Sequence, residues 1–217
     1  MKTMNGDFLF FIIFLITFVG IFVIRGYYGW KSPDRKKSLR ELTRSSTKHE
    51  GRVTFTLLVF LGIIWLVALV LYIFFPYLFP WMVLPIPDWF RWLGVIIAFI
   101  SLFLLWWAHA TLGKAFSKIL TIQDQHTLVS NGPYQRVRHP MYTAFIILFL
   151  SWFLMTAHIL FFFLWFTFLV YIVLRMPQEE AMLLEKFGET YREYILRTGR
   201  LFPPLRKQNK EDKINQG

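Results

Sequence analysis

Long apolar stretches dominate the chain and are separated by polar segments rich in basic residues. A helix that spans a membrane needs about 20 mostly apolar residues, within a range of about 17–25. Four blocks satisfy this requirement, namely residues 8–24, 53–75, 92–108 and 141–174. The pattern therefore predicts an all-α integral membrane protein.

The fourth block, residues 141–174, is too long for one spanning helix. It contains a single polar interruption, Thr156-Ala157-His158. Each half has 17 residues and reaches about 25 Å as a helix. We therefore expect a tight helical hairpin that turns at residues 156–158 near the outer interface, which brings the number of transmembrane helices to five.

The pattern changes after the hairpin. The apolar residues that follow recur at the spacing of one helix face: Leu184, Phe187, Tyr191, Tyr194 and Ile195. Pro177 and the acidic pair 179–180 suit a helix start, and Gly199 suits a stop. We expect a cytoplasmic amphipathic helix over 178–197, and a polar tail over 206–217.

The basic residues indicate how the chain is oriented. Nine Lys and Arg lie in residues 25–52, four in 109–140 and nine in 175–217, whereas 76–91 contains only Arg91. Cytoplasmic loops carry the excess of positive charge. Five crossings place these three segments on the cytoplasmic side if the N-terminus lies outside and the C-terminus inside, in a plasma or inner membrane or in the endoplasmic reticulum.

Composition excludes several classes of protein. Of 217 residues 56% are hydrophobic and 17% charged, against about 25% charged in soluble domains, so a soluble enzyme and a nuclear factor are excluded. The net charge of +11 is distributed between apolar runs, where it favours contact with membrane lipids over nucleic acid. The chain has no cysteine, which excludes disulfides and thiolate metal sites.

The unusual chemistry lies in residues 126–142, HTLVSNGPYQRVRHPMY, together with the residues after the hairpin. Asn-Gly-Pro indicates a turn, and Pro140 suits the first turn of a helix. On composition alone, the favoured interpretation of Arg136, Arg138, His139 and Arg175 is that they are positive charges flanking a span. Glu179 and Glu180 are then simply favourable charges at a helix start.

Taken together, these motifs resemble a known family. HTLV at 126–129, GPY at 132–134, RHPMY at 138–142, Arg175, the acidic pair 179–180 and FGETYREY at 187–194 follow one another in order. The chain resembles the isoprenylcysteine carboxyl methyltransferases, and is similar to the broader membrane methyltransferases that include phospholipid N-methyltransferases. The resemblance covers about residues 110–205. The apolar blocks predict three N-terminal transmembrane helices over 1–108, with the basic loop 25–52. The resemblance implies a methyltransferase core over 109–205.

The resemblance also implies a cofactor, S-adenosyl-L-methionine, and a lipidic or prenylated methyl acceptor that enters from the bilayer. It implies no obligatory protein partner and no metal. Arg175 is implied to face the acceptor as the catalytic residue. The implied cofactor contacts are His126, Thr127, Leu128, Val129, Tyr134, His139, Pro140, Met141, Tyr142, Glu179 and Glu180.

These residues have the chemistry that such a site needs. The cofactor requires a carboxylate for its ribose or amine, donors for its own carboxylate and apolar walls for its ring, and Glu179, His139 and the tyrosines are of these types. Arg175 is suited to hold a carboxylate acceptor in a bidentate pair. It lies four residues before Glu179, so a helix would place both on one face, but Pro177 interrupts that spacing.

Two departures from the family keep other functions open. Ala144 stands where the family often has glycine, and Ile119 where some members have a cofactor-binding glutamine. The alternatives are a phospholipid or small-lipid N-, O- or S-methyltransferase, a non-catalytic membrane scaffold or transporter subunit, and a reductase related to the sterol reductases. His109 is expected to be a satisfied interfacial histidine, and His158 to lie on the outer turn.

Overall fold

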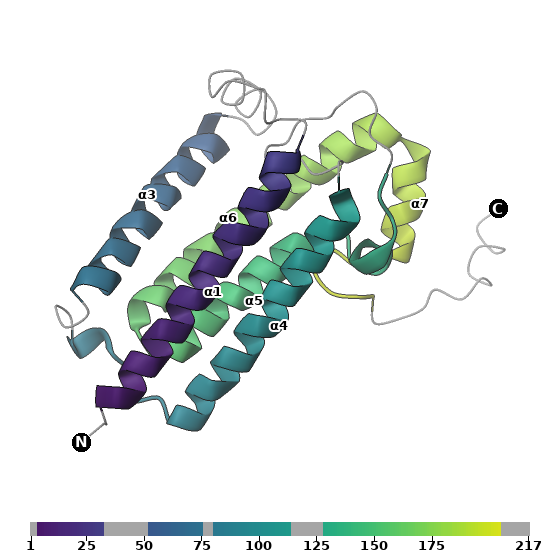
Figure 1. Ribbon diagram of the computed structural model, residues 1–217. Helices are drawn as coiled ribbons and strands as arrows, with labels where there is room; N and C mark the ends of the chain where they lie inside the picture. Colours follow the sequence, from purple (N-terminus) through teal and green to yellow (C-terminus); the bar gives the residue numbers. More distant parts are fainter. Residues whose placement is uncertain (1–3, 33–51, 76–79, 114–127, 205–217) are drawn as a thin grey trace.

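The computed structural model describes residues 4–32, 52–75, 80–113 and 128–204. Within these residues the regular elements are all helical, and Figure 1 shows five long helices running alongside one another. They are α1 (Met4–Lys31), α3 (Arg52–Phe74), α4 (Asp88–Leu112), α5 (Pro140–Thr156) and α6 (Ile159–Phe187), with the shorter η2 (Pro80–Met82), η4 (Gly132–Gln135) and α7 (Glu189–Arg197). The predicted all-α fold is confirmed.

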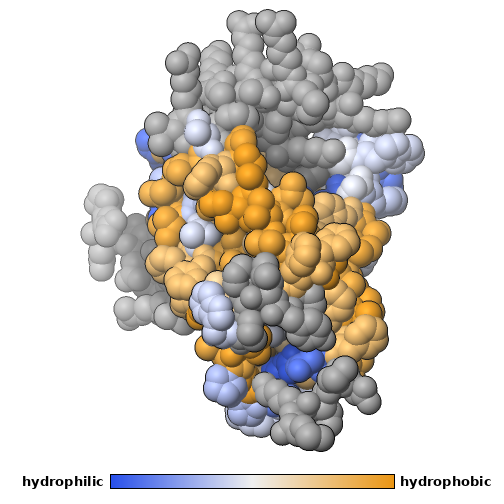
Figure 2. Space-filling model, turned by 90° about the vertical axis from the view of Figure 1, so that its left-hand side faces the viewer, coloured by the Kyte–Doolittle hydropathy of each residue, from blue (hydrophilic) through white to orange (hydrophobic). Residues whose placement is uncertain are grey.

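Three of the described helices, α1, α4 and α6, are long and apolar enough to cross a membrane. The apolar parts of α3 (Val59–Phe74) and α5 are shorter. Figure 2 shows a broad hydrophobic surface across the middle of one face, with hydrophilic residues toward its two ends. The chain is an integral membrane protein, and the number of five crossings stays a prediction.

The hairpin turn lies where the sequence predicts it. Helix α5 ends at Thr156, and Ala157 adopts the left-handed conformation with φ 54°. The His158 side chain then accepts a hydrogen bond from the backbone N–H of Leu160 (3.3 Å) and caps the start of α6. The His158 side chain is buried, so this turn is packed into the protein and is not a solvent-exposed loop.

Two predicted boundaries are wrong. The basic segment expected to be a loop from residue 25 is helical up to Lys31 in α1. The expected helix 178–197 does not begin at Pro177, because α6 continues through that proline to Phe187. Proline removes only one helical hydrogen bond, and the break comes at Gly188, whose φ of 53° suits a residue without Cβ. Helix α7 follows as a separate element.

The helices are joined by small residues and by aromatic rings. At Gly94, a Cβ would lie 2.9 Å from the backbone nitrogen of Met155, so glycine allows α4 to approach α5 closely. The ring of Phe14 in α1 lies 5.2 Å from those of Trp152 and Phe161. These contacts tie α1, α5 and α6 into one core.

The opposite end from α7 holds a buried arginine. Arg91 in the first turn of α4 is 4% exposed. Its Nε donates to the carbonyl of Met155 (3.0 Å), its Nη1 donates to Oδ1 of Asp7 (2.6 Å), and its guanidinium lies 3.9 Å from the ring centroid of Phe10. One side chain thus links α1, α4 and the end of α5.

We expect Arg91→Ala to lower the free energy of unfolding by about 2 kcal/mol, because it leaves a buried carbonyl without its donor. Thermal unfolding of the detergent-purified protein measures the loss. Asp88→Asn is the matched control, since this exposed carboxylate lies 3.6 Å from the same guanidinium and such pairs contribute about 0–1 kcal/mol. Equal effects of the two substitutions would contradict the assignment of a structural role to Arg91.

Candidate functional site

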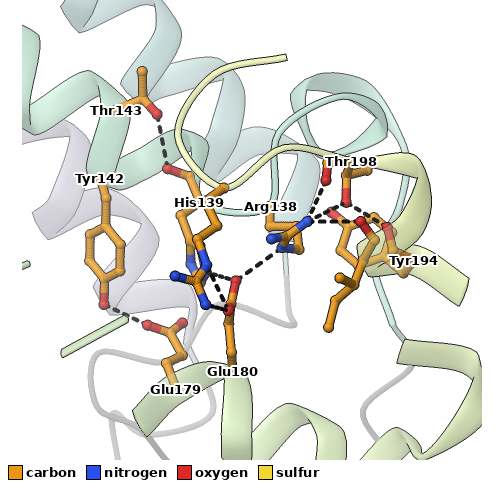
Figure 3. A network of polar contacts seen from close by, with 10 residues as sticks. Arg138, His139, Tyr142, Thr143, Glu179, Glu180, Tyr194 and Thr198 are labelled. Atoms are coloured by element: carbon orange, nitrogen blue, oxygen red, sulfur yellow. Dashed lines mark hydrogen bonds and ion pairs between the residues drawn. The ribbon is translucent and has the colours of Figure 1, made fainter. Parts of the chain in front are cut away.

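The start of α5 and the second half of α6 meet at one end of the helices, and this contact is the centre of the candidate site. The hydroxyl of Tyr142 donates a hydrogen bond of 2.6 Å to Oε2 of Glu179, which lies 37 residues later in the chain. Both side chains are half-buried, and Figure 3 shows them pointing toward one another. The RHPMY motif and the acidic pair, which are separate in sequence, therefore contribute to one candidate site.

Arg175 shares a helix face with Glu179. Because α6 passes through Pro177 without a break, the four-residue spacing places the two side chains one turn apart. The Nη1 atom of Arg175 donates to the hydroxyl of Tyr171, and its guanidinium lies 5.7 Å from the ring centroid of that tyrosine. The Arg175 guanidinium and the Glu179 carboxylate thus lie on the same face of α6.

His139 supports Tyr142 from the other side. The two rings are stacked with centroids 5.5 Å apart and an angle of 19° between their planes. The Nε2 atom of the buried His139 lies 3.3 Å from Oε1 of Glu180. The imidazole thereby connects the first carboxylate of the acidic pair, through Tyr142, with the second.

Glu180 has a different environment from Glu179. Its Oε1 accepts a hydrogen bond from Nε of Arg138 (3.0 Å), and its Oε2 pairs with Nη2 of Arg200 (2.7 Å). The Glu180 side chain is 10% exposed. With two guanidiniums and His139 around it, this carboxylate is held in place by protein groups, as Figure 3 shows for Arg138 and His139. Its predicted contact with the cofactor stays a prediction.

Residues 198–201, which we call the C-terminal strap, run beside the RHPMY motif. The N–H of Arg138 donates to the carbonyl of Gly199 (2.8 Å), and that of His139 to the carbonyl of Arg200 (3.0 Å). The side chain of Arg138 also donates to the carbonyls of Ile195 (3.1 Å) and Thr198. The strap thus fixes the backbone from which His139 and Tyr142 project.

Tyr134 brings a buried hydroxyl to the same region. Its side chain is 6% exposed, and its backbone carbonyl accepts a hydrogen bond from the hydroxyl of Tyr194 (2.7 Å). Burial, and then the nearby charge of Glu179, raise the pKa of Tyr134 well above its ordinary value. No described residue hydrogen-bonds to the Tyr134 hydroxyl itself, so a neutral donor is available close to the Glu179 carboxylate.

Most of the predicted site residues therefore lie at this end of the molecule. Pro140 is the first residue of α5 and is fully buried, and Met141 packs against the main core. Leu128 and Val129 are half-buried. His126, Thr127 and Ile119 lie outside the described residues. Ala144 is completely buried, so its methyl group is accommodated in a packed helix.

Other residues of this end were missed by the sequence analysis. Arg200 follows the predicted helix stop and shows no periodicity that would indicate its ion pair with Glu180. Arg25 was assigned to the basic loop, but it lies within α1 and its guanidinium is 5.3 Å from the ring centroid of Phe145. His109, by contrast, was expected from the sequence to be a satisfied interfacial histidine, and it is buried, with Nδ1 at 2.8 Å from the carbonyl of Leu105.

Comparison with known proteins shows which family this part of the chain is similar to. Residues 92–185 match the model of the isoprenylcysteine carboxyl methyltransferase (ICMT) family. A probable protein-S-isoprenylcysteine O-methyltransferase from Oryza sativa subsp. indica is 32% identical over 110 residues, which cover 49% of this chain and 58% of that protein. A methanethiol S-methyltransferase from Pseudomonas deceptionensis is 43% identical over 74 residues, 34% of this chain and 28% of that protein.

A likeness in fold extends over a longer stretch of the chain. The eukaryotic intramembrane Ras methyltransferase ICMT matches with a TM-score of 0.57 and 18% identity, over 93% of this chain and 69% of that one. At this identity the likeness concerns the fold alone. The family model matches less than half of the chain, and the chain spans 58% of the length of the Oryza protein, so these comparisons show a similarity of residues 92–185 to the isoprenylcysteine carboxyl methyltransferase family.

Proposed function

We propose that the protein is an S-adenosylmethionine-dependent methyltransferase that acts on a lipidic or prenylated acceptor at the membrane. The observation that carries the proposal is the 2.6 Å contact between Tyr142 and Glu179, because it joins the RHPMY motif to the acidic pair. With the N-terminus outside and the C-terminus in the cytoplasm, this end of the molecule faces the compartment that supplies the cofactor.

The groups present fit such a cofactor. Glu179 is a half-buried carboxylate that accepts a hydrogen bond from the Tyr142 hydroxyl, so it is suited to pair with a ribose diol or an ammonium group as well. The hydroxyl of Tyr134 is buried without a described partner, and such a group costs about 1–3 kcal/mol unless a ligand or water satisfies it. When bound, the cofactor supplies an activated methyl group on a sulfonium.

The protein's own residues would position the reactants. Glu179, Tyr142 and Tyr134 would orient the cofactor, while Arg175, one helical turn away, would hold an anionic acceptor group beside it. Methyl transfer is an in-line displacement, so orientation and removal of water supply most of the acceleration. A carboxylate acceptor is already a nucleophile and needs no general base.

We therefore expect Arg175→Lys to reduce methyl-ester formation about tenfold, because lysine replaces a planar bidentate donor with a point charge. The rate with a carboxylate acceptor should change little above about pH 5, since ordinary carboxylates are then ionised. Initial rates of label transfer from methyl-labelled cofactor at several pH values measure both effects. An unchanged rate in Arg175→Lys would contradict this role.

The experiment that tests the proposed function uses expressing membranes and methyl-labelled S-adenosylmethionine. Extraction and mass spectrometry identify the lipid or prenylated product that gains the label. Base-labile label in an apolar product is the expected result, since methyl esters hydrolyse in base. Membranes that transfer no more label than membranes without the protein would contradict it.

A small thiol is the second candidate acceptor, and the Pseudomonas relative favours it, since that protein is named a methanethiol S-methyltransferase. A thiol reacts as the thiolate, and free cysteine thiols have a pKa of about 8.5. The rate with a thiol acceptor should therefore rise through pH 7–9, approximately tenfold per pH unit below the thiol pKa. A pH-independent rate would favour the carboxylate.

A further inference from the structure

Helix α7 turns back toward the apolar helices. The hydroxyl of Tyr194 in α7 donates a hydrogen bond to the carbonyl of Tyr134 in η4 (2.7 Å). The first residue of η4, Gly132, lies against the last turn of α4, where a Cβ would come within 2.6 Å of the hydroxyl oxygen of Thr111. Figure 1 shows α7 running back from the end of α6 toward the ends of α4 and α5. Through η4, α7 is thus tied to the last turn of α4.

This turn of α4 lies where an apolar helix meets the lipid headgroups. The hydroxyl of Thr111 donates to the carbonyl of Trp107 (2.9 Å), one turn earlier. Trp106 and Trp107 are exposed on the surface of this apolar helix. Tryptophan side chains gather at headgroup depth in membrane proteins. Helix α7 is therefore placed beside the membrane interface and does not project far into the water.

The C-terminal strap reaches the same depth from the side of α5. The hydroxyl of Thr143 donates to the carbonyl of Leu201 (2.7 Å). Thr143 belongs to the first turn of α5, an apolar helix that begins at Pro140. The residue that follows the strap, Phe202, is therefore held beside the first turn of that helix.

Two large apolar side chains are exposed in this region. Leu196 in the last turn of α7 is 54% exposed, and Phe202 is 66% exposed. Single exposed apolar residues are ordinary on a protein surface, but both of these belong to segments bonded to the start of α5. On either side of Leu196, the carbonyls of Ile195 and Thr198 accept from Arg138. At this depth Leu196 and Phe202 can contact headgroups and the upper parts of acyl chains.

The charges around these two residues are mostly positive. Residues 194–210 contain no acidic residue and five basic ones, namely Arg197, Arg200, Arg206, Lys207 and Lys210. Arg197 is exposed, and Glu193, one turn earlier, is the last acidic residue before this stretch. With the N-terminus outside, this end of the molecule faces the cytoplasmic leaflet, whose anionic lipids attract Lys and Arg. The sign of the charge thus matches that surface.

We propose that Leu196, Arg197 and Phe202, which we call the interfacial corner, bind the membrane surface. Leu196 and Phe202 lie among the lipid headgroups, and Arg197 pairs with the phosphates of anionic lipids. Basic and apolar side chains together are typical of segments that lie in the plane of an anionic membrane surface. The corner thereby holds the C-terminal strap, and the RHPMY backbone bonded to it, against the bilayer. This contact does not depend on methyl transfer.

The test uses the absence of cysteine from the chain, which allows one spin label to be attached at a chosen position of the full-length protein. The labelled variants are Leu196→Cys and Phe202→Cys. Trp107→Cys is the reference for lipid contact. Thr190→Cys is the matched aqueous control, since Thr190 is exposed in the first turn of α7. Each protein is reconstituted into phosphatidylcholine vesicles with about 30% phosphatidylglycerol, an anionic lipid.

Accessibility to oxygen, which concentrates in the bilayer, is compared with accessibility to a water-soluble nickel chelate. The oxygen-to-nickel ratio at positions 196 and 202 is expected to exceed that at 190 about threefold and to approach that at 107, as for side chains within the interface. Equal ratios at 202 and 190 would overturn the proposal. Low accessibility to both agents, with dipolar broadening between labels of two molecules, would show that a second copy covers the corner and would overturn it too.

Lipid composition tests the part assigned to Arg197. Omitting phosphatidylglycerol should lower the ratio at Phe202→Cys about twofold, because the attraction between Arg197 and anionic headgroups is lost. Adding Arg197→Gln to Phe202→Cys should remove this dependence on lipid charge. Arg192→Gln is the control and should retain it, since Arg192 is exposed and pairs with Glu189. A ratio that does not respond to phosphatidylglycerol, or responds equally in both arginine variants, would contradict the contact of Arg197 with headgroups.

Discussion

Glu179→Gln is expected to weaken the binding of S-adenosylhomocysteine about 100-fold. Glu179 is the half-buried carboxylate that Tyr142 orients, through a hydrogen bond of 2.6 Å. Glutamine preserves the shape but removes the charge that would pair with the ammonium or ribose of the ligand. Loss of one partner of a charged hydrogen bond in a site costs about 2–5 kcal/mol, and about 2.7 kcal/mol corresponds to a hundredfold.

Isothermal titration of the detergent-purified protein measures this effect. Tyr142→Phe removes only the orienting hydroxyl, so a smaller loss of about fivefold is expected, equal to about 1 kcal/mol. Glu189→Gln is the control, because its carboxylate is exposed at the start of α7 and pairs with Arg192. If Glu179→Gln and Glu189→Gln bind the ligand equally well, Glu179 is not a cofactor residue.

Arg138→Gln is expected to have the second large effect, on the fold of the site. The Arg138 side chain is 7% exposed and links the Glu180 carboxylate to the carbonyls of Ile195 and Thr198. Its removal leaves a buried carboxylate with fewer cations and the C-terminal strap with fewer bonds. Breaking a buried ion pair from one side costs about 3–5 kcal/mol, and the loss should appear in the free energy of unfolding.

Thermal unfolding and limited proteolysis measure this loss, with cleavage expected to increase near the strap. Arg192→Gln is the matched control, since Arg192 pairs with Glu189 where both side chains are largely exposed, and exposed pairs contribute about 0–1 kcal/mol. If Arg138→Gln unfolds at the same temperature as wild type and is cleaved no faster near the strap, the ion pairs of Glu180 do not stabilise the site.

The helices and the turn could be predicted from sequence because their causes are local. Apolar blocks of sufficient length form helices wherever backbone groups lack water, which places α1, α3, α4 and the hairpin. The polar residues 156–158 interrupt the longest block, and the turn forms there. The proximity of Tyr142 and Glu179 was predicted from the resemblance, and in the structure the two side chains form a hydrogen bond.

The features that could not be predicted from the sequence depend on packing between segments that are distant along the chain. Pro177 predicts a helix start, yet α6 continues through it. The helix is long enough on both sides of Pro177 to tolerate one missing hydrogen bond. Arg25 and Arg200 look like ordinary basic residues near a membrane. The contact of Arg25 with the ring of Phe145 exists only because α1 lies against α5. The ion pair of Arg200 with Glu180 exists only because the strap lies against the RHPMY motif.

We propose that the start of α5 and the second half of α6 form one cofactor site. Photolabelling with an azido-adenine analogue of S-adenosylmethionine, followed by trypsin and mass spectrometry, tests it most directly. Cleavage after Arg138, Arg175 and Lys186 gives peptides 139–175 and 176–186. We expect label in these two peptides, and we expect excess S-adenosylhomocysteine to abolish it. Competed label confined to residues before 114, or no competed label at all, would contradict it.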